Sequence, residues 1–127
     1  MANTIPTAAT NPKLATPLQK SFIREMIMSQ DPAGYIANCR AIETASPPNY
    51  AAVTCPMLIV AGDIDKSAPV EGCKFIYESL TGVKEGEKEI EVLPGVGHWY
   101  AVEAAEIVGE VVASWCDQWA GKVGGGN

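Results

Sequence analysis

The fold of this chain is decided by the stretch MLIVAGDID, residues 57–65. Its first five residues are all apolar and lie between Pro56 and Gly62, which gives the run the length of a β-strand. A strand that is apolar at every position, rather than at alternate ones, is typical of a parallel sheet covered by helices on both faces. We therefore predict a buried strand at residues 57–61, followed by a loop that carries two aspartates.

A second strand is predicted farther along the chain, after one helix. The helix begins at Pro69, and apolar residues recur in it at helical spacing as far as Leu80. Residues 89–93, EIEVL, alternate between acidic and apolar side chains, which predicts a strand with one solvated face. An apolar stripe then predicts a long closing helix from Val102 to Trp119. The order strand–helix–strand–helix is typical of an α/β fold.

The amino-terminal part of the chain has a different character. Residues 1–15 are small and polar and contain prolines, which predicts an irregular lead-in. Thr16 and Asp31 each stand directly before a proline, and a capping residue followed by proline is a common helix start. We predict two amphipathic helices over residues 16–45, paired as a helical hairpin.

The charge changes at about the same place as the predicted structure. Residues 1–50 carry three acids and four bases, whereas residues 51–127 carry twelve acids and five bases, for a net charge of −6. Neither part has the basic patch that a nucleic-acid partner requires, and an acidic surface does not suit anionic lipid. We divide the chain into a lead-in and helical segment (1–50), an α/β segment (51–121) and a glycine-rich flexible tail (122–127).

The cysteines and the single histidine limit the kinds of site that the chain can hold. The four cysteines form no C-x-x-C pair, so neither a metal site nor a cofactor is predicted. The sequence has no signal peptide of the usual form and no apolar run of about 18 residues. We therefore expect reduced thiols, a cytoplasmic protein and no membrane partner.

Two predicted loops place chemically useful side chains at one edge of the sheet. The loop after the first strand carries Asp63 and Asp65, and the loop after the second, PGVGHW, carries His98. Ligand sites in parallel sheets lie beyond the carboxyl ends of the strands, and a right-handed crossover brings both loops to that edge. A carboxylate beside an imidazole orients the ring and stabilises the imidazolium that forms in general-base catalysis.

These motifs, in this order and with a closing amphipathic helix, resemble the carboxyl-terminal part of an α/β-hydrolase. The resemblance covers roughly residues 16–119 and is nearest to small esterases and 3-oxoadipate enol-lactonase-like enzymes. In that family the catalytic triad runs in the order Ser, Asp or Glu, His. The resemblance implies that Asp65 is the triad acid, with Asp63 as the alternative, and that His98 is the triad base. The helices predicted before residue 50 would then be the end of a cap, or lid, over the pocket.

Each of these assignments has a plainer alternative. His98 could be an ordinary loop histidine, and Asp65 could cap a turn before the next helix. Trp99, Met26 and Tyr35 are candidates to line a substrate pocket, but apolar residues at helical spacing more often pack in a core.

The nucleophile of the family has no counterpart in this sequence. None of the six serines lies in a G-x-S-x-G motif, and the early strands of the fold are missing. We therefore expect a fragment of a serine hydrolase acting on an ester, lactone or similar carbonyl substrate, and no triad hydrolysis by the chain alone. The alternative is a truncated pseudoenzyme or interaction module, because the apolar edge of residues 57–61 could pair with a partner or a second copy. A flavodoxin-like binding domain is weaker still, because no glycine-rich phosphate turn is present.

Overall fold

A computed structural model describes residues 2–120 of the chain. The predicted flexible tail at 122–127 lies outside the described residues. The elements are two strands, a 3₁₀ turn and six helices within that range, in the following order: α1 (Ile5–Ala8), α2 (Pro17–Met28), α3 (Pro32–Thr44), η1 (Tyr50–Ala52), β1 (Met57–Gly62), α4 (Val70–Ser79), β2 (Lys88–Leu93), α5 (Tyr100–Glu103) and α6 (Ala105–Ala120). No helix in the described part is long and apolar enough to cross a membrane.

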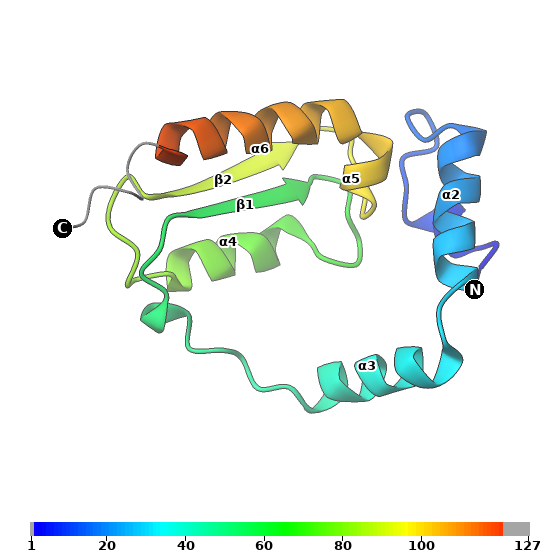
Figure 1. Ribbon diagram of the computed structural model, residues 1–127, viewed down its shortest axis with the longest axis horizontal. Helices are drawn as coiled ribbons and strands as arrows, with labels where there is room; N and C mark the ends of the chain where they lie inside the picture. The colour runs from blue at the N-terminus through cyan, green and yellow to red at the C-terminus, as the bar shows by residue number, and fades with distance from the viewer. Residues whose placement is uncertain (1, 121–127) are drawn as a thin grey trace.

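The centre of the fold is a parallel pair of strands. β1 pairs with β2 in a register that sets Met57 opposite Lys88 and Gly62 opposite Leu93. Figure 1 shows α4 on one face of this sheet and α6 on the other. The predicted α/β class, with two parallel strands and flanking helices, is confirmed.

One cluster of buried apolar residues lies near the carboxyl end of the sheet, beneath the two loops that follow the strands. Leu93, Val96 and Ala104 form a buried cluster, against which partly buried residues of β1, α5 and α6 pack. A Cβ at Gly62 would lie 2.3 Å from the carbonyl oxygen of Val96, so the end of β1 and the second loop can approach closely only at a glycine. At the other end, Lys88 Nζ donates to the carbonyl oxygens of Tyr77 and Leu80 and so caps α4.

α2 begins where its sequence predicts and is attached to the rest of the chain by apolar and polar contacts. Thr16 and Gln19 form a reciprocal capping box at its start. Gln19 Nε2 also donates to the carbonyl oxygen of Val102 at 2.6 Å. Ile23 is fully buried, whereas Leu18, on the same helix, is 80% exposed. The buried Ile23 and the Gln19 bond, together with a bond of 2.9 Å from Arg24 Nε to Asn3 Oδ1, therefore attach α2 to the rest of the chain.

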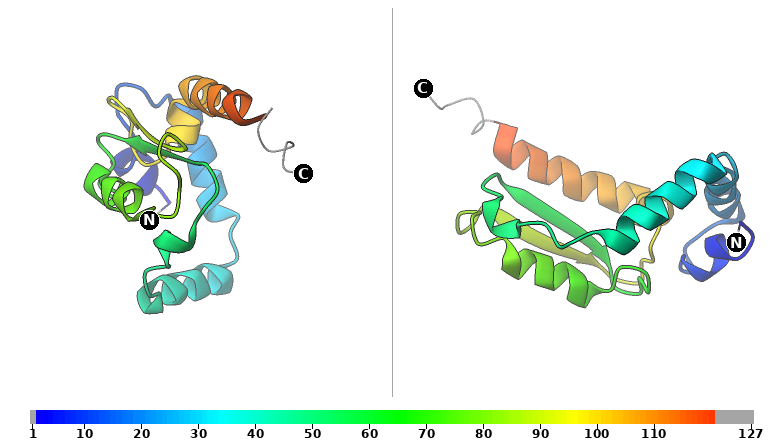
Figure 2. Two further views of the ribbon diagram at one scale, coloured as in Figure 1. Left: turned by 90° about the vertical axis from the view of Figure 1, so that its left-hand side faces the viewer. Right: turned by 90° about the horizontal axis from the view of Figure 1, so that it is seen from below.

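The predicted helical hairpin does not form. Asp31 caps α3 by accepting from the backbone N–H of Gly34, as expected, but α3 turns away from α2 and from the sheet (Figure 2). No residue of α3 is buried, and Ile42 is 76% exposed. A helix start and an apolar stripe predict a helix but do not supply the surface against which it packs.

Two further boundaries differ from the sequence-based expectation. Residues 1–15 are not simply irregular, because they contain α1 and bury Pro6, Thr10 and Ala15. The predicted helix from Val102 to Trp119 is two helices, separated at Ala104, whose backbone leaves the helical region. The first of them, α5, turns the chain just after the loop that carries His98, so that Glu103 points back towards that loop.

Candidate active site

Asp65 and His98 meet at the carboxyl edge of the sheet, as the two loops predict. His98 Nδ1 lies 2.9 Å from Asp65 Oδ2. The carboxylate side chain is 4% exposed, whereas the imidazole is 44% exposed. The acid is therefore buried beneath the ring, and the ring is the partner that a ligand can reach.

The other oxygen of Asp65 is held by its own loop. Asp65 Oδ1 accepts from the backbone N–H of Ser67 at 2.7 Å and of Ala68 at 3.0 Å. Burial by itself would raise the pKa of Asp65, but the bonds from Ala68, His98 and Ser67 outweigh it, so the pKa lies below its usual value. Asp65 is therefore ionised at neutral pH.

The ionised carboxylate decides which ring nitrogen carries the hydrogen. A carboxylate can only accept, so Nδ1 of His98 must be the donor in the contact with Asp65. In the neutral ring Nε2 is then the unprotonated nitrogen, and it is available to take a proton from a reacting group. This is the tautomer that a general base needs.

Asp63, the alternative acid, has a different contact. Its Oδ1 accepts from the backbone N–H of Gly95 at 2.5 Å and so ties the loop after β1 to the loop after β2. Gly95 has a φ of 70°, a left-handed conformation that favours glycine in this turn. The structure brings Asp65, and not Asp63, to His98.

A buried glutamate that the sequence did not single out also holds the His98 loop. Glu103 is 7% exposed and accepts from the backbone N–H of Gly97 at 3.0 Å and of Asn11 at 2.7 Å. In the sequence it reads as an acid in the first turn of a helix, which the helix dipole favours. Its burial depends on the break at Ala104 and on the amino-terminal segment, neither of which the sequence predicts.

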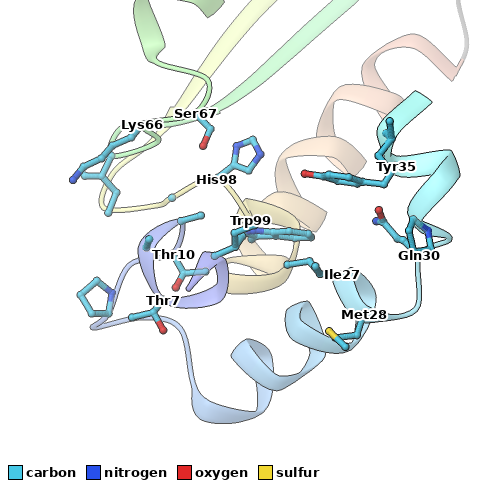
Figure 3. Close-up of a pocket in the computed structure, with 18 residues that line it drawn as sticks. Thr7, Thr10, Ile27, Met28, Gln30, Tyr35, Lys66, Ser67, His98 and Trp99 are labelled. Carbon is cyan, nitrogen blue, oxygen red and sulfur yellow. The ribbon is translucent and has the colours of Figure 1, made fainter. Parts of the chain in front are cut away.

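A large cleft opens beside His98, with a volume of about 1100 Å³. Figure 3 shows the rings of His98, Trp99 and Tyr35 along this cleft. The walls are mostly apolar and come from α1, α2, α3 and the two loops, with Ile5, Ile27, Met28, Tyr35, Ile36 and Trp99 among them. Lys66 is the cation among the lining residues of the described chain.

Of the three candidate pocket residues, two line the cleft and one does not. Trp99 and Tyr35 line the cleft, whereas Met26 is not among its lining residues and is 39% exposed elsewhere on α2. α2 presents Ile27 and Met28 to the cleft instead. The indole Nε1 of Trp99 is buried and has no hydrogen-bond partner among the described residues. No group of three or more His, Cys, Asp or Glu side chains within residues 2–120 is arranged to hold a metal ion.

Solved structures of two hydrolases share this fold. A thermophilic esterase from Thermogutta terrifontis, solved with malate bound, superposes with a TM-score of 0.79 at 21% identity, over 92% of this chain and 43% of its own. A serine hydrolase involved in carbazole degradation, the CarC enzyme, gives a TM-score of 0.71 at 22% identity, over 92% of this chain and 46% of its own. No protein-family model matches the chain, and no curated protein matches it in sequence. The chain therefore has the fold of part of an α/β-hydrolase and spans less than half the length of these two enzymes.

Proposed function

We propose that this chain supplies the acid and the base of a serine α/β-hydrolase that acts on an ester, lactone or similar carbonyl substrate. The observation that carries the proposal is the contact between His98 and the buried, ionised Asp65, at the edge of the sheet where a large apolar cleft opens. The two structural neighbours, an esterase and a serine hydrolase, support the same reaction class.

In this mechanism the nucleophile is a serine outside this sequence. Its hydroxyl oxygen attacks the carbonyl carbon while His98 Nε2 takes the hydroxyl proton. Collapse of the tetrahedral intermediate breaks the bond to the leaving alkoxide, which receives that proton from His98. Water then repeats the sequence on the acyl-enzyme, releasing the acid and restoring the serine. Throughout, Asp65 accepts from Nδ1–H and stabilises the imidazolium.

The proposal is tested in a chimera. This chain replaces the part of the Thermogutta terrifontis esterase on which it superposes, so that the remaining part supplies the serine. We expect hydrolysis of a p-nitrophenyl ester that falls about 10³-fold or more in kcat when His98→Ala is introduced. Glu106→Gln, on the exposed first turn of α6, is the matched control and should leave the rate unchanged.

Two results in the chimera and one in the chain alone would overturn this function. One is a chimera that folds by circular dichroism but does not hydrolyse the ester. The other is hydrolysis that survives His98→Ala. The chain alone should be inactive, so turnover by the purified 127-residue protein that is lost in His98→Ala would also contradict the proposal.

The alternative function is a non-catalytic interaction module. The outer edge of β1 has no strand beside it in the described chain, and α3 leaves apolar side chains such as Ile42 exposed. This function predicts a defined complex or dimer formed through β1, whereas the hydrolase function predicts a chain that stays incomplete until it joins the rest of the enzyme. Sedimentation of the purified chain, with and without an Ile59→Lys substitution in β1, distinguishes the two.

We also propose a cytoplasmic location. The supporting observation is that all four cysteines are free, as expected where thiols stay reduced.

A further inference from the structure

Glu103 is a buried carboxylate that the proposed mechanism does not use. Both of its oxygens bond to main-chain N–H groups, and the two donors come from parts of the chain that are 86 positions apart: Gly97, just before the histidine, and Asn11, after α1. A buried charge is costly unless it is fully hydrogen-bonded, and two charge-assisted bonds of 2.7 and 3.0 Å meet that requirement.

Further bonds join the same two segments around Glu103. The backbone N–H of His98 donates to the carbonyl oxygen of Ala9 at 2.8 Å, and Asn11 Nδ2 donates to the carbonyl oxygen of Gly95. There is no space at Gly97 for a side chain, since a Cβ there would lie 2.7 Å from the Ala9 oxygen and 2.8 Å from Glu103 Oε1. The segment after α1 and the histidine loop therefore lie against each other with main chain touching main chain.

This contact lies directly beside the cleft. Residues of the segment from Ile5 to Pro12 form one wall of the cleft, and Gly97, His98 and Trp99 form part of the adjoining wall. Within the described chain, Glu103 is the one side chain that accepts from main-chain N–H groups of both segments, at Asn11 and Gly97.

We propose that Glu103 is a positioning residue: it fixes the loop that holds the His98 ring in contact with Asp65 and at the wall of the cleft. It does not touch the substrate, and it acts through the backbone of Gly97 and Asn11. We call the two bonds from Glu103 to the main chain of Gly97 and Asn11 the clamp. The clamp is a property of this chain, so only its consequence for catalysis rests on the proposed function. The role requires two acceptor oxygens: an aspartate keeps both with a shorter reach, whereas a glutamine has one acceptor and presents an N–H to the second N–H.

The clamp is tested by amide hydrogen exchange in the full 127-residue chain. Glu103→Gln should speed exchange at the amides of Gly97 and Asn11 about tenfold or more, because each loses a charge-assisted bond. Glu103→Asp should give an intermediate rate, which keeps the test available if the glutamine variant does not fold. Glu106→Gln, an exposed glutamate three residues away, is the control and should leave both amides unchanged. Unchanged exchange in folded Glu103→Gln would overturn the proposal.

The effect on His98 is tested by a signal that general loss of stability would not move. His98 is the single histidine of the chain, so its ring gives one set of NMR resonances. The Nδ1 proton bonded to Asp65 should appear far downfield in the wild type and should shift or broaden in Glu103→Gln well below the melting temperature. If it stays unchanged there, Glu103 does not position the ring.

The chimera separates this proposal from the function on which part of it rests. Glu103→Gln should lower kcat at least tenfold, and Glu103→Asp should recover part of the loss. An inactive wild-type chimera with fast exchange in Glu103→Gln would leave the clamp standing and overturn the hydrolase function. An active chimera whose kcat is the same with Glu103→Gln would support the hydrolase function and overturn the role of Glu103 in positioning His98 for catalysis.

Discussion

Asp63 and Asp65 stand two positions apart after β1 and bond to different parts of the second loop. Asp63 accepts from the backbone of Gly95 at 2.5 Å, whereas Asp65 meets the His98 side chain at 2.9 Å. One carboxylate therefore fixes the position of the loop, and the other orients its imidazole.

Substitution of the two aspartates should separate these roles. In the chimera, Asp65→Asn should lower kcat by about 10³- to 10⁴-fold, because the amide can hold His98 in the wrong tautomer. Asp63→Asn should cost about 1–2 kcal/mol of stability through the lost charge-assisted bond and lower kcat by less than tenfold. Ester hydrolysis and urea unfolding measure the two effects. A larger kcat loss for Asp63→Asn would make Asp63 the triad acid.

The pH dependence of stability should carry a contribution from Asp65. Its pKa is lower in the folded chain than in the unfolded one, so the unfolded state binds the proton more readily. The stabilisation is fully present above the unfolded pKa, about 4, and is lost as the pH falls from there through the folded pKa. Urea unfolding between pH 6 and pH 3 should show that the free energy of unfolding falls less steeply with pH in Asp65→Asn than in the wild type.

The same titration has an internal control in His98→Ala. That variant keeps the bonds from Ser67 and Ala68 to Asp65. Its loss of stability as the pH falls should therefore be shallower than in the wild type but steeper than in Asp65→Asn. Equal slopes in the wild type and Asp65→Asn would contradict the lowered pKa.

Ile23 should be the residue that attaches α2 to the rest of the chain. It is fully buried, so Ile23→Ala should lower the free energy of unfolding by about 2–4 kcal/mol. Leu18→Ala removes a similar side chain that is 80% exposed, and its effect should stay within about 0.5 kcal/mol. Chemical denaturation followed by circular dichroism compares the two. Similar losses would mean that α2 is held in another way.

Tyr35 and Met26 offer a matched pair for the cleft. Their exposures are close, 42% and 39%, but only Tyr35 lines the cleft. For a bulky apolar ester in the chimera, Tyr35→Ala should raise KM about three- to tenfold, as expected for a lost apolar contact of roughly 1 kcal/mol. Met26→Ala should leave KM unchanged. A rise in KM for Met26→Ala alone would place the substrate on the other side of α2.

The strand pair and the contact between Asp65 and His98 could be predicted because local sequence and topology determine them. An apolar run bounded by Pro56 and Gly62 predicts a strand, and topology then brings the two following loops together. The predicted burial of the whole run is wrong: residues 57–60 are half-buried, because the described chain has no strand beside the outer edge of β1. The choice between Asp63 and Asp65 needed the structure, because it depends on which carboxylate meets a ring and which meets a main-chain N–H.

The parts that could not be predicted depend on contacts far apart in sequence. Buried Glu103 accepts a hydrogen bond from the backbone N–H of Asn11, which is 92 positions away. The direction of α3 depends on a packing surface that the described chain does not give it, so its helical pattern could not show that the hairpin would fail. α1 has only four residues and no apolar periodicity, and its place is set by tertiary contacts.

All three carboxylates around the loops bond to the main chain: Asp63 to Gly95, Asp65 to Ser67 and Ala68, and Glu103 to Gly97 and Asn11. Every residue except proline carries that N–H group, so the bonds themselves do not depend on which side chains the donors bear. Such a site therefore requires that a few acidic residues and the conformation of the backbone be kept. Gly95 and Gly97 must stay glycine because of a left-handed φ and a close main-chain contact, but drift at the other donors, Asn11, Ser67 and Ala68, would leave these bonds in place. This gives one route by which a fold of this kind can persist among chains that share only about a fifth of their residues.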